Sequence, residues 1–221
     1  MIIIKIINAK YEIVNKEKVN GIDILKGIEA VGRTCYKSEN NITDDSAIKF
    51  AKMLIERGHE AMIEHNSVSV RFVCDRGVSH ELVRHRLASF GQESTRYCNY
   101  SKNKFGNELT FIKPCFWEEN SEEFKEWKVV METVEKQYLK LIEMGSKPQE
   151  ARSVLPNSLK TEIVVTMNIR EWRHFFGLRA DTPAHPQMRE VVVPLLLEMN
   201  DLIPVVFEDI VYKLREKGAI K

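Results

Sequence analysis

Residues 121–144 carry the longest amphipathic pattern in the chain, and this pattern constrains the fold more than any other feature. Gly145 follows directly, and glycine is typical of the position just past a helix end. The apolar stripe recurs at helical spacing and consists of Val130, Val134, Tyr138, Leu141 and Ile142. We therefore predict one long helix over 121–144 that buries one face against a core.

A period-2 pattern at residues 67–74 predicts a strand with one buried face, which carries Val68, Val70 and Phe72. Its expected partner is the segment 108–112, and further strands are predicted at 2–7 and 161–167. Helices are predicted near 22–32, 45–57, 146–156, from Asn168 through Phe175, and over 186–217 with breaks at Pro194 and Pro204. Residues 1–221 thus read as a single α+β domain, with a mixed or antiparallel sheet of few strands flanked by long helices.

Charge and cysteine content exclude several classes of protein. The formal net charge of the 221 residues is +1, so affinity for phosphate must come from local clusters of cations. The four cysteines form no CxxC pair and are expected to be free thiols. The apolar N-terminal stretch is short and broken by Lys5 and Lys10, so we expect no signal peptide and no membrane span. A cytoplasmic protein is predicted.

The segment 84–97, RHRLASFGQESTRY, concentrates cations. We predict a helix from Val78 to about Phe90, with Ser79 as its N-cap and the RHR triplet on it. Gly91 would end that helix, and the following turn would bring Ser94 and Arg96 together as a phosphate cradle. Two alternatives stay open, namely solvated helix arginines and a nucleic-acid patch, although few aromatic residues interleave with the cations.

The segment Gly58–His65 holds two histidines and two carboxylates. The six-residue spacing of His59 and His65 is unlike the four-residue spacing of a helical zinc site. We therefore predict no metal site, and we interpret His59 as a polar wall of a substrate pocket.

A third cluster follows the strand at 161–167. Asn168 is predicted to cap a helix on which Arg170 and His174 are neighbours on one face. Arg179 lies just past Gly177, where the carbonyls at the helix end attract a cation. A core histidine and a solvated cap remain open as alternatives. No nucleophile elbow, Walker loop or dinucleotide fingerprint is present.

At these residues the sequence closely resembles the flavin-dependent thymidylate synthases. The hallmark is RHR followed after seven residues by serine, which residues 84–86 and Ser94 satisfy. Supporting pieces stand in order across about residues 30–190, namely Gly58-His59-Glu60, Ala151 to Pro156, Asn168-Ile169-Arg170 and Leu178 to Asp181.

The resemblance implies methylation of dUMP to dTMP in thymidylate biosynthesis. It further implies 5,10-methylenetetrahydrofolate as carbon donor, bound FAD as cofactor and NADPH as reductant. A homotetramer with shared active sites is implied too, without nucleic-acid or membrane partners.

The resemblance also assigns roles to individual residues. Arg179 would be catalytic, stabilising negative charge on the uracil ring, and His59 would line the folate and nicotinamide entrance. The substrate would be bound by Glu81, Arg84, Gln92, Ser94, Arg96, Arg152 and Arg179. The flavin would be bound by Arg84, His85, Arg86, Gln92, Asn168, Arg170 and His174.

One departure from the family pattern falls before the motif serine. Where the family has an asparagine-glutamate-glutamine run, this chain has Gly91-Gln92-Glu93. Two other functions therefore stay open. One is a non-catalytic nucleotide- or RNA-binding module that uses arginines as phosphate clamps, and the other is a relative that keeps the fold and flavin without thymidylate synthesis.

Overall fold

The computed structural model describes residues 4–102 and 108–221. Its strands are β1 Lys5–Ile7, β2 Lys10–Ile13, β3 Ser67–Asp75, β4 Ala88–Gln92, β5 Thr110–Ile112 and β6 Lys160–Asn168. Its helices are α1 Gly21–Tyr36, α2 Ser46–Glu56, α3 Arg76–Leu82, α4 Glu122–Glu143, α5 Pro148–Ala151, α6 Ile169–Arg179, α7 Pro186–Leu202 and α8 Glu208–Glu216. This mixture confirms the predicted α+β class.

The chain forms two compact units. Unit 1 contains the described residues of 1–10, 72–84 and 91–164, and unit 2 contains 11–71, 85–90 and 165–221. A two-stranded sheet pairs β1 with β5 in parallel, with Lys5 opposite Thr110. A second sheet has the strand order β2-β3-β6-β4, and the division between the units falls within β3 and β6.

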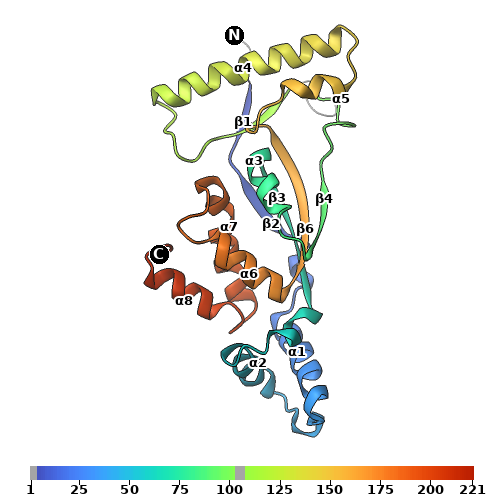
Figure 1. Ribbon diagram of the computed structural model, residues 1–221, viewed down its shortest axis with the longest axis vertical. Helices are drawn as coiled ribbons and strands as arrows, with labels where there is room; N and C mark the ends of the chain where they lie inside the picture. Colours follow the sequence, from blue (N-terminus) through green and yellow to red (C-terminus); the bar gives the residue numbers. More distant parts are fainter. Residues whose placement is uncertain (1–3, 103–107) are drawn as a thin grey trace. The chain divides into compact units, whose positions relative to one another are not determined.

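Unit 1 is organised around the long helix α4, and α5 lies beside one end of it (Figure 1). The Ser121 hydroxyl caps α4 by accepting from the Phe124 N–H at 3.2 Å, and Gly145 ends it with a φ of 96°. The apolar face packs into a core of Ile4, Tyr100, Leu109, Phe111, Met131, Tyr138, Ala151 and Leu159. The long helix predicted from the amphipathic pattern is confirmed.

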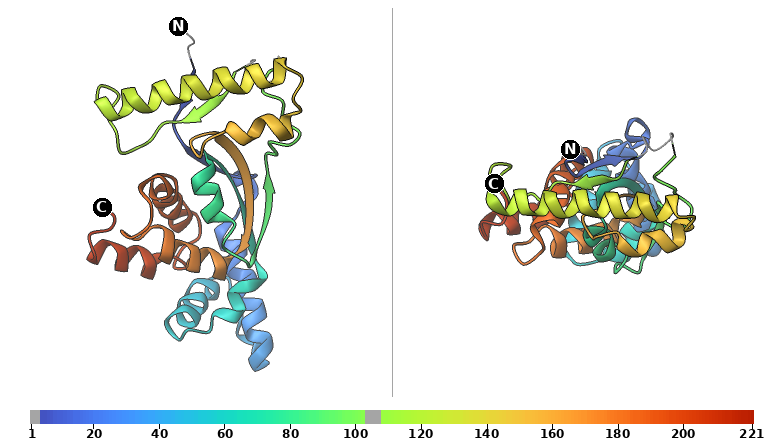
Figure 2. Two further views of the ribbon diagram at one scale, coloured as in Figure 1. Left: turned by 45° about the horizontal axis from the view of Figure 1, so that its top comes forward. Right: turned by 90° about the horizontal axis from the view of Figure 1, so that it is seen from above.

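Unit 2 is largely helical, and Figure 2 shows α6, α7 and α8 grouped together in it. Its core is aromatic, because the Trp172 ring stacks on Phe176 at 5.5 Å and Phe176 meets Phe207 edge-on at 5.4 Å. The Trp172 indole N–H donates to the Val68 carbonyl at 3.0 Å, so α6 is tied to strand β3. This contact fixes the helix that carries the third sequence cluster.

The predicted helix over 78–90 is wrong in its extent. Helix α3 ends at Leu82, RHR lies in the turn that follows, and residues 88–92 form strand β4. Asp75 is the N-cap, whereas the Ser79 hydroxyl donates back to the Arg76 carbonyl. The extended pairing available to residues 88–92 in the sheet overrides their helical spacing, since propensity is a weak prior against tertiary context.

Two further predictions need correction. The segment 110–112 pairs with β1 instead of β3, because β3 lies between β2 and β6. Pro194 does not interrupt α7, and the break before α8 comes at residues 203–207, which include Pro204. The strand expected at 2–7 appears as β1 from Lys5, with residues 1–3 outside the described chain. The helices at 45–57 and after Asn168 and the strand at 161–167 are confirmed.

The cysteines and the hydropathy of the helices can be compared with the sequence predictions. All four cysteines carry free thiols, as predicted. Within residues 4–102 and 108–221, no helix is long and apolar enough to cross a membrane.

Candidate active site

Unit 1 contains a cavity of about 410 Å³ that is lined by cations and hydrogen-bond donors. The Arg152 guanidinium donates to the buried Thr95 hydroxyl at 3.4 Å. The Nη1 of Arg76 is buried and has no hydrogen-bond partner among the described residues. The lining residues are Arg76, Thr95, Gln149, Arg152, Ser153 and Leu155, with no carboxylate among them. Such a cavity suits an anion with several oxygen acceptors, since the buried Nη1 of Arg76 is costly without an acceptor and phosphate oxygens match the guanidinium fork.

Each of the two arginines lies at an end of a short helix. Arg76 opens α3, where the Asp75 carboxylate accepts from the Val78 N–H at 2.7 Å and the Arg76 N–H donates to Asn157 at 2.8 Å. Arg152 follows α5, whose first residue is Pro148 and whose first turn is capped by Glu150 through the Lys147 N–H. The sequence predicted Arg152 but missed Arg76, although an aspartate cap after a buried strand could have indicated that the next residue is held in place.

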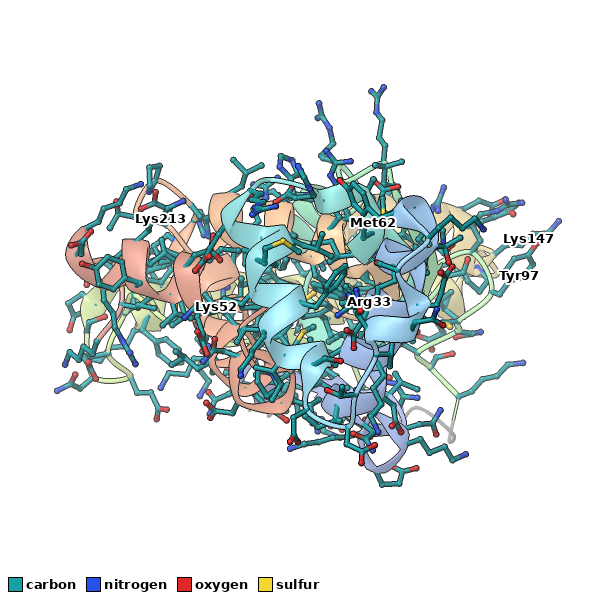
Figure 3. The ribbon with its side chains drawn as sticks, turned by 90° about the horizontal axis from the view of Figure 1, so that it is seen from below. Arg33, Lys52, Met62, Tyr97, Lys147 and Lys213 are labelled. Carbon is teal, nitrogen blue, oxygen red and sulfur yellow. The ribbon has the colours of Figure 1, made fainter. Side chains whose placement is uncertain are left out.

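Ser94 and Arg96 lie close together after β4, and their role as a phosphate cradle stays a prediction. The Arg96 N–H donates to the Ser94 hydroxyl at 3.3 Å, and the Cys98 N–H donates to the Ser94 carbonyl at 2.9 Å. The Arg96 guanidinium lies 5.5 Å from the centre of the exposed Tyr97 ring, which Figure 3 labels at the surface of this unit. Thr95, which contacts Arg152, is the residue between them. Ser94 and Arg96 therefore flank a lining residue of the cavity.

The Gly91-Gln92-Glu93 segment is tied into unit 1 by its side chains. The Gln92 amide donates to Ser79 at 2.9 Å and to Thr161 at 3.3 Å. Glu93 accepts from the Tyr100 hydroxyl at 2.8 Å and pairs with Lys160 at 3.0 Å. These bonds give Gln92 and Glu93 a structural role next to the serine turn.

Two other predicted substrate residues lie on and just after α3. Glu81 is half-buried on α3, and Arg84 is exposed in the turn that follows, where its N–H donates to the Glu81 carbonyl at 3.2 Å. Neither lines the anion cavity.

In unit 2, His85 forms hydrogen bonds with both Glu171 and Arg179. His85 Nδ1 lies 3.0 Å from a Glu171 carboxylate oxygen, and the Arg179 Nε–H donates to His85 Nε2 at 3.2 Å. Only 5% of His85 and 7% of Glu171 is exposed. The Phe175 ring packs edge-on against His85 at 4.9 Å, and His174 does so at 5.8 Å. The structure thus brings together His85, which the resemblance assigns to the flavin, and Arg179, which it assigns to the uracil ring, and Glu171 was missed as a site residue.

The pKa of His85 is lowered from its usual range, mainly because burial disfavours the imidazolium form. The hydrogen bond to Glu171 acts in the opposite direction and raises the His85 pKa, while the Arg179 charge lowers it. The net effect favours a neutral ring.

The ligand atoms of His85, Glu171 and His174 lie within 4.8 Å of one another, which is the geometry of a possible metal site. Both nitrogens of His85 already take part in hydrogen bonds, and one faces the Arg179 guanidinium. A cation there would meet that positive charge, so the contacts favour a hydrogen-bonded relay over a metal centre.

A second cavity, of about 680 Å³, lies in unit 2 and brings together the predicted flavin residues Asn168, Arg170 and His174. Its cations are matched by carboxylates. Arg170 pairs with Glu64 at 2.5 Å and with Glu60 at 3.3 Å. Three further cations that line it, Arg173, Lys213 and Lys217, are paired with Asp209, Asp209 and Asp181, respectively. The Lys213 side chain is labelled in Figure 3 on α8.

The remaining predicted residues of unit 2 are exposed. Arg86 lies in the bend before β4, and no carboxylate in the described part of the chain pairs with it. His59 precedes the 3₁₀ helix Glu60–His65 and does not line the 680 Å³ cavity, although Glu60 does. That 3₁₀ helix contains His65.

Solved structures share this fold. The chain superposes on the UMP/dUMP methylase PolB from Streptomyces cacaoi, in its complex with 5-Br dUMP, with a TM-score of 0.74. The match covers 93% of this chain and 96% of that chain at 23% sequence identity. The complex of PolB with 5-Br UMP gives a TM-score of 0.73 at 20% identity. The chain thus has the fold of a protein described as a nucleotide methylase.

Sequence comparison then specifies the family. The family model described as "Thymidylate synthase complementing protein" matches residues 22–205. The flavin-dependent thymidylate synthase of Pyrococcus furiosus is 35% identical over 179 residues, which cover 79% of this chain and 72% of that protein. The enzyme of the same name from Geobacter sulfurreducens is 30% identical over 189 residues, covering 82% and 80%. The chain belongs to the flavin-dependent thymidylate synthase family, which confirms the resemblance and the enzyme class.

The 680 Å³ cavity could hold part of a flavin, and nine of its fifteen lining residues are charged. Leu87 and Gly177 contribute apolar surface, and the exposed His174 contributes a ring for stacking. The pyrophosphate of FAD needs cations, and Arg170 could serve it only by giving up part of its pairing with Glu60 and Glu64. Arg86 belongs to the same unit and has no carboxylate partner among the described residues, so it suits a pyrophosphate better.

Proposed function

We propose that this chain methylates dUMP to dTMP, with 5,10-methylenetetrahydrofolate as carbon donor, FAD as bound cofactor and NADPH as reductant. The observation that carries the proposal is the anion cavity of unit 1. It places Arg152, a residue predicted for the substrate phosphate, beside the unpartnered Nη1 of Arg76 and contains no carboxylate. Two guanidinium groups without acidic partners suit the dianionic phosphate of a nucleotide.

The substrate residues of unit 1 would act as binders. Arg152 and Arg76 would contact the phosphate in the cavity, and Ser94 and Arg96 would contribute a hydroxyl and a cation from the adjoining turn. Ser94 is not positioned as a nucleophile, because among the described residues its oxygens accept hydrogen bonds from backbone N–H groups and from no base. Binding a remote phosphate in this way positions the uracil ring for reaction.

Arg179 would act on the pyrimidine. For C5 of uracil to attack carbon, negative charge must spread over the ring, and a guanidinium stabilises that charge because it stays protonated. The contact with His85 holds Arg179 through its Nε–H. A bound flavin would supply the electrons that reduce the transferred carbon to a methyl group.

The assembly and the remaining site assignments are part of the proposal. We expect residues 1–221 to act as one domain, which the family match over 22–205 supports. The enzyme would be a cytoplasmic homotetramer with active sites shared between subunits. His59 would line the folate and nicotinamide entrance, and Arg84, His85, Arg86, Gln92, Asn168, Arg170 and His174 would bind FAD.

Purified protein loaded with FAD provides the direct test. We expect dTMP to form from dUMP only when methylenetetrahydrofolate and NADPH are both present, and NADPH oxidation to accelerate on addition of dUMP. A yellow protein that oxidises NADPH without forming dTMP would indicate a relative that has lost thymidylate synthesis. A colourless protein whose nucleotide affinity falls steeply with salt would indicate the phosphate-clamp module.

A further inference from the structure

We propose that Glu171 is a positioning residue of this reaction, whose carboxylate holds the His85 ring so that the ring accepts the Nε–H of Arg179. The inference rests on the proposed function for its kinetic part, because Arg179 is the residue assigned to the uracil ring. No sequence pattern pointed to Glu171 as a site residue, and its role follows from contacts within unit 2.

The tautomer of His85 follows from its two partners. Arginine can only donate, so the His85 Nε2 that faces the Arg179 Nε–H at 3.2 Å must be the unprotonated nitrogen. A neutral ring then carries its proton on Nδ1, which lies 3.0 Å from the Glu171 carboxylate. The carboxylate accepts that proton's hydrogen bond and selects the tautomer that Arg179 requires.

The local fold holds Glu171 in place for this task. Glu171 lies in the first turn of α6, where its N–H donates to the Asn168 cap at 2.9 Å and the positive helix end favours a carboxylate. Arg179 is the last residue of the same helix. One helix therefore presents both partners to His85, and the Phe175 ring at 4.9 Å restricts rotation of the imidazole.

Protonation of His85 would break this arrangement. An imidazolium carries a proton on both nitrogens, so Nε2–H would face the guanidinium and the acceptor would be lost. The charged groups that face His85 are Glu171, Arg179 and His174, and burial together with Arg179 keeps its pKa low. The activity should therefore fall on the acid side as His85 takes up a proton.

Glu171→Gln tests the inference because it keeps the shape and removes the charge. We expect kcat to fall roughly tenfold or more, the scale of one hydrogen bond to a charged group, with KM for dUMP changed about twofold or less. Because Glu171 raises the His85 pKa, its neutralisation should move the acid limb of the kcat profile to lower pH. A general loss of stability would not move that limb in this direction.

Glu29→Gln is the matched control. Glu29 is 1% exposed, belongs to unit 2 and pairs with Arg33 at 2.7 Å, so its replacement also removes a buried carboxylate. Figure 3 labels Arg33 on its helix. An acid limb in Glu171→Gln that matches wild type, together with a kcat loss no larger than in Glu29→Gln, would overturn the inference.

Histidine ¹⁵N NMR of the wild-type protein decides the same point without a measurement of activity. His85→Gln identifies the His85 signals by their loss. A neutral ring with the proton on Nδ1 supports the inference, and a proton on Nε2 overturns it. If the wild-type protein forms no dTMP, the proposed function fails. The NMR result still decides whether His85 adopts the tautomer expected from its contacts with Glu171 and Arg179.

Discussion

The two cavities differ in whether the arginines that line them are paired with carboxylates. In unit 1, Arg76 and Arg152 line a cavity of about 410 Å³, and none of the described residues that line it carries a carboxylate. In unit 2, the cations that line a cavity of about 680 Å³, such as Arg170 and Arg173, are paired with acidic side chains. An unpaired guanidinium keeps its hydrogen-bonding capacity for an anionic ligand, whereas a paired one mainly stabilises the fold. The first cavity therefore suits a phosphate, whereas the cations of the second are already neutralised by carboxylates.

The largest effect on stability is expected at Arg173. Its guanidinium is 9% exposed and contacts both Asp209 oxygens, at 2.7 and 2.9 Å, and the Val206 carbonyl. We expect Arg173→Met to lower the free energy of unfolding by about 3–5 kcal/mol, because Asp209 is left half-buried without its partner. Urea unfolding measures the loss. The double variant Arg173→Met/Asp209→Leu should recover part of it, and an additive double variant would contradict a paired role.

Arg152→Ala should have the largest effect on substrate binding. Loss of a charge-assisted phosphate bond is expected to raise KM for dUMP roughly 10- to 100-fold while kcat at saturation changes little. Steady-state kinetics measures both constants. Lys147→Ala is the control, because Lys147 is an exposed cation near the same short helix, labelled in Figure 3, and does not line the cavity. Equal effects of the two variants would show that only general charge matters.

Arg76→Met should separate binding from stability. We expect KM for dUMP to rise about tenfold while the free energy of unfolding stays within about 1 kcal/mol of wild type or increases, because Nη1 lacks a partner that could be orphaned. Kinetics and urea unfolding on the same preparation measure the two quantities. Binding of deoxyuridine, which has no phosphate, should not change. A loss of stability like that of Arg173→Met would show that Arg76 has a structural role.

The smallest effect on stability is expected at Arg170. Its pairs with Glu60 and Glu64 are exposed, and such pairs contribute on the order of 0.5 kcal/mol. Arg170→Met should therefore leave stability almost unchanged, and it should weaken FAD binding only if Arg170 reaches the pyrophosphate. Glu64→Gln sharpens the test, because release of Arg170 from its partner should then strengthen FAD binding. Flavin fluorescence titration measures both, and unchanged affinity in both variants would remove Arg170 from the flavin site.

Several features could be predicted from sequence because they depend on neighbours along the chain. The long helix α4, the N-cap Asn168 and the strand β6 follow from local spacing and capping chemistry. The contact of the Arg96 N–H with Ser94 is equally local, whereas the phosphate cradle predicted for these two residues stays a prediction. The order of motifs also identified the family, which the comparisons confirm.

The class of this protein, its family and the residues that local patterns single out therefore follow from the order of residues along the chain. Which of these residues form hydrogen bonds or ion pairs with one another depends on the tertiary structure. Helical spacing at 78–90 gave way to β4 because sheet pairing offers those residues long-range hydrogen bonds. The relay joins His85 to Glu171 and Arg179 across more than 80 positions. Arg173 contacts a carboxylate and Arg76 faces a cavity because of residues that are distant in the chain. Local sequence patterns do not predict such long-range contacts.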